Sequence, residues 1–216
     1  MCRHVAKLLI GQRDIAALYE SGICSMDRHM SRTRNVYWQG VRAGAPFLLV
    51  VAPFGLLFGV VAREAGFDLV QAMAMTALVI AGAAQFASVQ LLVDGAPVFV
   101  AILTGLAVNL RMVMYSASLT PHLGKAPTWQ KVIMSYFMVD QSYGVSIEKY
   151  EKDPAMPLPE KVSYYFGVIS AIAPFWYGFS FIGALAGSAI PPEYALDFAI
   201  PITFIALVAP SLRSLP

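Results

Sequence analysis

The sequence predicts an all-α integral membrane protein with about six transmembrane or broken helices. Apolar residues make up 58% of the 216-residue chain, charged residues make up 13%, and the mean hydropathy is +0.64. These values lie outside the usual range of soluble domains. Several uncharged stretches are also close to the ~20 residues that a helix needs to cross a bilayer core. The lipid bilayer is therefore the expected solvent for most of the chain.

Residues 1–35 differ from the rest, because basic residues are set among short apolar runs. We expect residues 1–35 to form a weakly ordered cytoplasmic leader and residues 36–216 to form the transmembrane domain. An interaction helix, or a true start at Met26 or Met30, are the alternatives for the leader. Basic residues favour the cytoplasmic side of a membrane, which places the N-terminus in the cytoplasm. The basic cluster before the first apolar segment comprises Arg28, Arg32, Arg34 and Arg42.

Six apolar segments are expected to cross or enter the membrane. They cover residues 41–62, 69–93, 96–121, 129–147, 162–190 and 198–210. The run 148–161, which has mixed charges and three prolines, is interpreted as a linker between two halves. Three full spans would place the basic loop around Lys125 outside the cell, against the preference of basic loops for the cytoplasm. We therefore expect an early segment to be broken or re-entrant, with the Gly and Ala run 81–87 as the candidate.

An Ala-Pro-Phe triplet occurs three times, at residues 45–47, 52–54 and 173–175. Pro46 and Pro53 are seven residues apart and share one helix face. Each proline removes a backbone donor, so irregular helices with freed backbone groups are expected there. Interrupted helices in corresponding positions of two halves point to a midplane site, and the triplets favour an inverted repeat of two halves. The alternative is that proline and glycine simply let membrane helices pack closely.

One face of the third segment is polar, because its polar residues recur at steps of three and four. This face comprises Thr104, Val108, Arg111, Tyr115, Ser118 and His122. Asp140 lies on a smaller polar face of the fourth segment, and Gln85 lies on one of the second. Charges within membrane segments face the interior and pair with each other, which predicts an Arg111–Asp140 ion pair. This pair would either serve function or only fix two helices, and His122 is expected at the interface.

Five blocks resemble the AzlC-type branched-chain amino acid permease family. They are GVRAGAPF at 40–47, APFG at 52–55, AGAAQFA at 81–87, NLR with YSASL within 109–119, and DQ at 140–141. The resemblance implies a multi-pass exporter of leucine, isoleucine, valine and similar amino acids such as methionine in the bacterial inner membrane. It also implies that the chain is the large subunit and acts with a small hydrophobic AzlD-type subunit.

The chain departs from this family at two places. Many relatives have an Asp-Glu pair where this chain has Asp140-Gln141, which leaves a second carboxylate without a counterpart. Relatives also continue beyond the equivalent of Pro210 with further hydrophobic segments, so the permease domain is expected to be truncated at its C-terminus. A truncated, non-transporting membrane scaffold is therefore one alternative function.

A zwitterionic amino acid requires donors for its carboxylate, acceptors for its ammonium and an apolar pocket for its side chain. Arg111 and helix-break amides near Pro46 and Pro53 are the expected donors. Asp140 and Gln141 are the expected acceptors, and Asp140 is the group that could carry a proton for coupling. The candidate substrate-binding residues are Pro46, Pro53, Gly55, Gln85, Asn109, Arg111, Tyr115, Asp140 and Gln141.

Other functional classes are disfavoured by the sequence. An intramembrane aspartyl protease needs two carboxylates at one site, whereas Asp140 is alone within the predicted spans. A serine hydrolase would require a Gly-x-Ser-x-Gly turn, which the sequence lacks. Cys2 and Cys24 form neither a disulfide framework nor a metal site, and no basic patch interleaved with aromatics suggests nucleic acid. We expect no catalysis, cofactor or metal.

Overall fold

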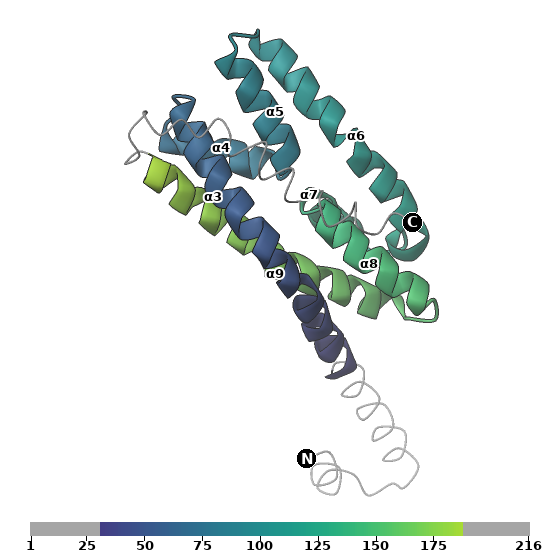
Figure 1. Ribbon diagram of the computed structural model, residues 1–216. Helices are drawn as coiled ribbons and strands as arrows, with labels where there is room; N and C mark the ends of the chain where they lie inside the picture. Colours follow the sequence, from purple (N-terminus) through teal and green to yellow (C-terminus); the bar gives the residue numbers. More distant parts are fainter. Residues whose placement is uncertain (1–30, 188–216) are drawn as a thin grey trace, which may run out of the picture.

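The computed structural model describes residues 31–187 as a set of α-helices (Figure 1). The predicted leader up to residue 30 and the predicted sixth segment at 198–210 lie outside the described residues. The first long helix, Ser31–Glu64, comprises helical residues 31–44, the 3₁₀ turn η2 (Ala45–Phe47) and α3 (Leu48–Glu64). The other helices are α4 (Leu69–Leu78), α5 (Gly82–Val93), α6 (Val98–Leu123), α7 (Thr128–Tyr136), α8 (Asp140–Lys152) and α9 (Leu158–Gly187).

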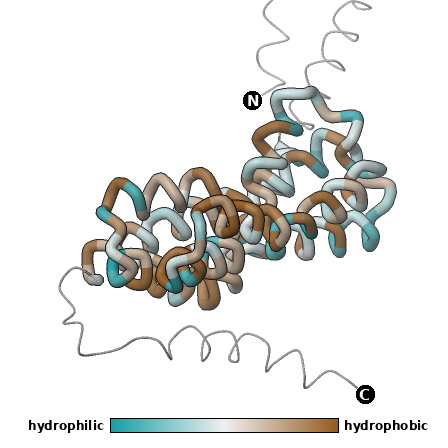
Figure 2. The backbone as a smooth tube through the Cα atoms, turned by 90° about the horizontal axis from the view of Figure 1, so that it is seen from above, coloured by the Kyte–Doolittle hydropathy of each residue, from teal (hydrophilic) through white to brown (hydrophobic). Residues whose placement is uncertain are grey.

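Three of these helices are long and apolar enough to cross a membrane: Ser31–Glu64, Val98–Leu123 and Leu158–Gly187. The shorter helices α4 and α5 are also apolar. Figure 2 shows hydrophobic segments continuing across the middle of the molecule, while hydrophilic positions are mostly near its ends. No strand occurs between residues 31 and 187, and the predicted all-α membrane fold is confirmed.

Two of the predicted segments are each broken into a pair of short helices. The second segment is interrupted at residues 79–81, where the backbone of Ala81 is extended (φ −153°, ψ 97°). This confirms the predicted break, although most of the run 81–87 is helical. The fourth segment is interrupted at residues 137–139, where Val139 is extended (φ −134°, ψ 165°). The prediction of one continuous helix over 129–147 is therefore wrong.

The predicted linker over residues 148–161 is also wrong in its extent. Helix α8 continues to Lys152 and α9 begins at Leu158, which leaves only residues 153–157 as the connection. Glu160 is 2% exposed and forms an ion pair with Arg32 (Nε–Oε1 2.8 Å). Packing against the first long helix thus keeps these hydrophilic residues within a helix.

The first long helix and α9 pack side by side and run parallel. Gly40 contacts the backbone of Tyr164, and further along Gly59 contacts the backbone of Gly183. A methyl group at Gly59 would collide with backbone atoms of α9. Small residues of this kind allow membrane helices to approach closely. This parallel pair, here called the stem, is the most extensive helix contact among the described residues.

Side-chain contacts fix the directions of the other helices. Arg111 contacts Asp140 and His122 contacts Tyr150, so α6 and α8 run parallel. Ser142 bonds Tyr165, whereas Tyr150 donates to the carbonyl of Lys161, so α8 and α9 run antiparallel. It follows that α6 runs opposite to the stem.

Helix α5 runs antiparallel to α6, to which it is joined by the short connection 94–97, and Ser88 Oγ donates to Ala101 O (3.1 Å). Helix α5 therefore has the direction of the stem.

These directions define an inverted repeat. In the first unit, α3 is followed by the broken pair α4–α5, and in the second unit, α6 is followed by the broken pair α7–α8. The connections 65–68 and 124–127 are equal in length, and so are the breaks 79–81 and 137–139. The first long helix and α6 run in opposite directions, and so do α5 and α8. A long helix followed by a broken helical hairpin is thus used twice, in opposite orientations.

The repeat is divided differently from what the Ala-Pro-Phe triplets suggested. The triplets lie on the two helices of the stem, which run parallel, so they do not relate inverted halves. Pro46, Pro53 and Pro174 are all exposed. Helices α3 and α9 continue through Pro53 and Pro174, whereas the turn at Pro46 is 3₁₀.

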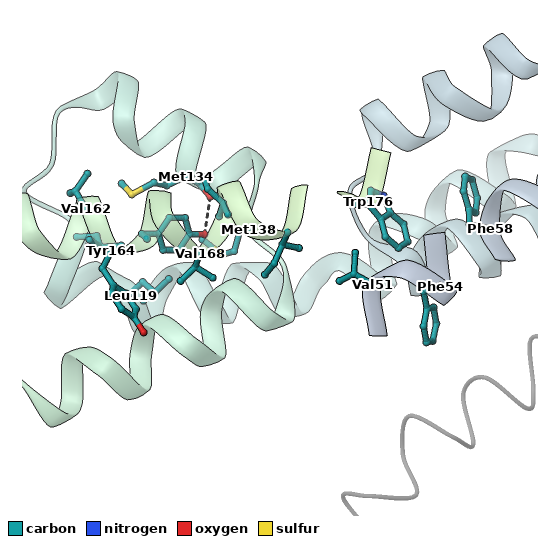
Figure 3. Close-up of a cluster of buried hydrophobic side chains, with 14 of the residues drawn as sticks. Val51, Phe54, Phe58, Leu119, Met134, Met138, Val162, Tyr164, Val168 and Trp176 are labelled. Carbon is teal, nitrogen blue, oxygen red and sulfur yellow. Dashed lines mark hydrogen bonds between the residues drawn. The ribbon is translucent and has the colours of Figure 1, made fainter. Parts of the chain in front are cut away.

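The buried apolar side chains follow the stem from one end to the other (Figure 3). Phe58 lies against Phe86 of α5, with ring centroids 5.9 Å apart. Toward the start of the stem, the hydroxyl of Tyr165 in α9 donates to Met134 O of α7 (3.0 Å). The two hairpins are therefore attached to opposite ends of one stem.

Candidate functional site

Both helix breaks open onto one cavity of about 140 Å³. One buried water needs only ~10–15 Å³ of such space, so the cavity has room for a small organic molecule. The breaks contribute Ile80, Ala81, Phe137 and Val139 to its lining. The first turns of α5 and α8, the middle of α6 and the stem complete it. Irregular backbone within a membrane protein is tolerated where it lines such a cavity.

An ion pair lies in the cavity wall. Arg111 Nη1 of α6 is 3.1 Å from Asp140 Oδ2 at the first residue of α8, which confirms the predicted pair. The two side chains are 34% and 43% exposed, so neither charge is sealed away from a ligand. Arg111 Nε is buried and has no hydrogen-bond partner in the described part of the chain. The guanidinium therefore keeps an unused donor beside the cavity.

Two half-helices begin at this cavity from opposite directions. Helix α5 begins at Gly82 and α8 at Asp140, and both residues line the cavity. The first N–H groups of a helix lack partners within the helix, and the dipole makes this end positive. In α8, Asp140 places a carboxylate in the first turn. In α5, the first turn carries no acidic residue.

The polar face of α6 packs along α8, as the spacing predicted. Tyr115 stacks on Tyr143 with ring centroids 4.1 Å apart and planes at 8°. Tyr143 also donates to Ser118 Oγ (3.1 Å). At the end of this face, His122 Nδ1 lies 3.4 Å from Lys161 Nζ. These contacts hold α8 in register, and with it Asp140 opposite Arg111.

Polar contacts also hold the hairpins in shape. Gln85 is fully buried, and its Nε2 donates to Met75 O (3.3 Å), which ties α5 to α4. The hydroxyl of Tyr136 donates to Ala77 O (2.6 Å) and lies 3.1 Å from that of Tyr177. The end of α7 is thus connected to the end of α4. The two breaks are held together by a bond between the hairpins themselves.

Of the nine predicted site residues, Arg111, Asp140 and Gln141 line the cavity. Gln85, Asn109 and Tyr115 lie on the helices that form it but are not part of its lining. Pro46 and Pro53 are exposed, and Gly55 packs against Phe179 and Ser180 of α9. The helix is irregular at Pro46, where it forms the 3₁₀ turn η2, and it continues as α3 through Pro53; neither proline is part of the cavity lining. Binding by amides near these prolines stays a prediction. The amides at the cavity come from the breaks at 79–81 and 137–139.

The sequence reasoning missed Trp176 and the second break. Trp176 of α9 belongs to the buried cluster drawn in Figure 3 and is 8% exposed. It also lines the cavity. A signal was present, because a tryptophan in an uncharged segment has an N–H that needs a partner when buried. The break at 137–139 had no such signal, since Phe137-Met138-Val139 contains neither proline nor glycine.

The rest of the cavity wall is apolar. Val51 and Phe54 come from the first long helix, Met112 comes from α6, and Ile169 and Ile172 come from α9. Among residues 31–187, no group of three or more His, Cys, Asp or Glu side chains could hold a metal ion. The cavity thus combines one positive and one negative group with an aliphatic and aromatic wall.

Comparisons with known proteins match this chain to membrane proteins. The model of the AzlC protein family matches residues 46–190. An uncharacterized membrane protein of Archaeoglobus fulgidus is 30% identical over 190 residues, covering 86% of this chain and 80% of the relative. The inner membrane protein YgaZ of Escherichia coli is 23% identical over 183 residues, covering 82% and 74%. No solved structure matches. The chain therefore belongs to the AzlC family of membrane proteins, which indicates a role in membrane transport.

Proposed function

We propose that this protein exports branched-chain amino acids, such as leucine, isoleucine and valine, and also methionine, across a bacterial inner membrane. The observation that carries the proposal is that helix breaks from two inverted units meet at one cavity beside Arg111 and Asp140. Secondary transporters place substrate sites at such repeat interfaces, between discontinuous helices. Alternating access then arises when one unit moves against the other around a fixed site.

The chemistry of the cavity supports an amino acid as the substrate. A zwitterion carries one positive and one negative group, and the cavity presents one group of each sign. The apolar wall suits an unbranched or branched aliphatic side chain and offers no partner for a charged one. A substrate with a single charge would pair with only one member of the Arg111–Asp140 pair and leave the other without an oppositely charged partner.

We propose further that the end of the molecule where the stem begins faces the cytoplasm. The connections 124–127 and 153–157 lie at this end, because α6 and α8 run opposite to the stem. Arg63 lies at the opposite end. Basic residues gather on the cytoplasmic side of membrane proteins. The described basic residues at the proposed cytoplasmic end are Arg32, Arg34, Arg42, Lys125, Lys131, Lys149, Lys152 and Lys161.

The proposed partner is a small hydrophobic subunit of the AzlD type. Helix α6 supports this, because its most apolar window is only 11% buried. Leu110 and Met114 on it are 64% and 71% exposed. Dependence of efflux on co-expression of the partner distinguishes a subunit on this surface from lipid.

The test is efflux of leucine, isoleucine, valine and methionine from bacteria loaded with the corresponding dipeptides. The chain is expressed with and without its small partner. The double variant Arg111→Gln with Asp140→Asn removes both charges together, which a scaffold should tolerate and a transporter should not. Lys125→Gln is the matched control, because it removes an exposed charge outside the cavity.

We expect partner-dependent efflux that the control retains and the double variant loses. Absence of efflux despite membrane insertion of both proteins would overturn the export function. Equal efflux from the double variant would show that the cavity charges serve architecture only.

The proposed orientation is tested by labelling with a membrane-impermeant maleimide. Cys2 and Cys24 are first replaced by Ser, and a single cysteine is then introduced as Lys125→Cys or Asp94→Cys. We expect Asp94→Cys to react in intact spheroplasts and Lys125→Cys only after permeabilisation. The reverse pattern would invert the orientation.

A further inference from the structure

We propose that the substrate carboxylate binds at the N-terminus of α5, where Trp176 and Arg111 add side-chain donors. The substrate ammonium binds Asp140, which occupies the corresponding position of α8. This subsite rests on the proposed amino-acid function and specifies how the cavity tells the two ends of the substrate apart.

The start of α5 is open to the cavity. Ala81, Gly82 and Ala83 all line it, and the N-cap residue Ala81 offers no side-chain acceptor to the first turn. The first backbone N–H groups of a helix have no partners within it and carry the positive end of its dipole. An anion at such a position is bound by several N–H groups at once. Helix α5 has 12 residues, so its dipole is fully developed.

Trp176 provides an independent sign that an acceptor is needed here. The side chain is 8% exposed, and its Nε1 is buried with no hydrogen-bond partner in the described structure. Indole nitrogen is only a donor, so nothing but an acceptor can satisfy it. The six-membered ring of the indole lies at the start of α5, since a Cβ on Gly82 would be 3.2 Å from Trp176 Cη2. A carboxylate in the cavity would supply the missing acceptor.

Glycine at the start of α5 also keeps this place open. Any side chain at position 82 would press on the Trp176 ring. The corresponding residue of the inverted unit is Asp140, whose carboxylate already faces the positive end of α8. The two half-helix starts therefore differ in charge although they share a geometry.

This difference sets the polarity of binding. A carboxylate is attracted to the α5 start, to Trp176 Nε1 and to the unused Nε of Arg111. It is repelled by Asp140, which instead attracts the ammonium. An amino acid is thus held between the two half-helix starts, with its side chain against Val51, Phe54 and Ile172.

The test measures binding to the full chain, with its partner, in lipid nanodiscs by calorimetry. The probes are leucine, leucinamide, which lacks the carboxylate, and 4-methylpentanoate, which lacks the ammonium. We expect leucinamide to bind at least about 10-fold more weakly than leucine. Trp176→Phe keeps an aromatic ring and removes the N–H donor together with part of the ring volume, and it should weaken the binding of leucine several-fold while changing that of leucinamide little.

The sharpest variant is Ala83→Asp, which gives the α5 start a carboxylate of its own. We expect it to weaken the binding of leucine at least about 10-fold. The protein should then bind leucinamide, a cation, more tightly than leucine. Ala83→Asn is the size-matched neutral control and should keep the preference for leucine. A monodisperse peak in gel filtration shows that each variant is folded. If Ala83→Asp does not fold, Trp176→Phe alone provides the test of the carboxylate subsite.

The outcomes separate the subsite from the function. If wild-type protein binds none of the amino acids, the amino-acid function is overturned and the subsite with it. If leucine binds but leucinamide binds equally well, only the carboxylate subsite is overturned. The carboxylate subsite is also overturned if Trp176→Phe and Ala83→Asp weaken the binding of leucine and of leucinamide by the same factor.

Discussion

The two hairpins of the molecule have the same geometry and different chemistry. The pair α4–α5 and the pair α7–α8 each follow a long helix, break for three residues and begin again at the cavity. At the restart, the first hairpin has Gly82 and Ala83, whereas the second has Asp140 and Gln141. The comparison shows how a symmetrical backbone can build an asymmetrical site, which suits a substrate with unlike ends.

The hairpins also differ in how they are held. The first is held by apolar contacts, because Phe86 of α5 lies against both Phe54 and Phe58 of the stem. The second is held by tyrosine hydroxyls and stacked rings along α6 and α9, including Tyr143 and Tyr150. Close packing therefore dominates the attachment of the first hairpin, and directional contacts contribute more to that of the second.

Removing the Asp140 charge, which distinguishes the two hairpins, should have the largest effect on efflux. Asp140→Asn makes both half-helix starts neutral and leaves Arg111 without its counterion. We expect efflux to fall about 100-fold, equivalent to about 2.7 kcal/mol. Dipeptide-loaded cells provide the measurement, with protein level determined by immunoblot. Efflux near the wild-type rate would show that the difference between the hairpins has no role in transport.

The stem to which both hairpins are attached should be the most sensitive to added volume. Gly59→Ala would press a methyl group against the backbone of α9, and overpacking of this kind costs about 1–3 kcal/mol. Gly178→Ala is the matched control, because it lies in α9 with nothing within 4 Å of its added Cβ. Thermal unfolding in detergent, followed by fluorescence, should show a lower midpoint for Gly59→Ala only. Equal midpoints would contradict close backbone packing.

Removing the hydrogen bond between the hairpins should have the smallest effect on stability and efflux. Tyr136→Phe removes the hydroxyl that donates to Ala77 O, which should cost about 1 kcal/mol. Tyr143→Phe removes a hydroxyl within the second unit and leaves the link between hairpins intact. We expect both variants to unfold at similar temperatures but only Tyr136→Phe to change the rate of efflux. Identical efflux rates would mean that this link does not influence transport.

Composition and periodicity were sufficient to predict the membrane fold, the polar face of α6 and the pairing of Arg111 with Asp140. Each depends on a local rule, namely segment length, helical spacing and the cost of charge in lipid. The inverted repeat could not be predicted in the same way, since Gly82 and Asp140 occupy matching positions without resembling each other. The prolines were a weaker guide, since a helix held by its neighbours can continue through such a residue, as it does at Pro53 and Pro174, or adjust locally to 3₁₀, as it does at Pro46.

The glycine contacts of the stem have a mechanical consequence. Two helices in contact along their backbones cannot slide or rotate past each other without separating, so the stem behaves as a fixed frame. In the proposed transport function, access to the cavity from one side and then the other would have to come from the parts around the stem. Each hairpin has a three-residue break at the cavity, and the helices that end at the two breaks are joined through Tyr136 and Ala77. This bond would couple movement of one hairpin to movement of the other.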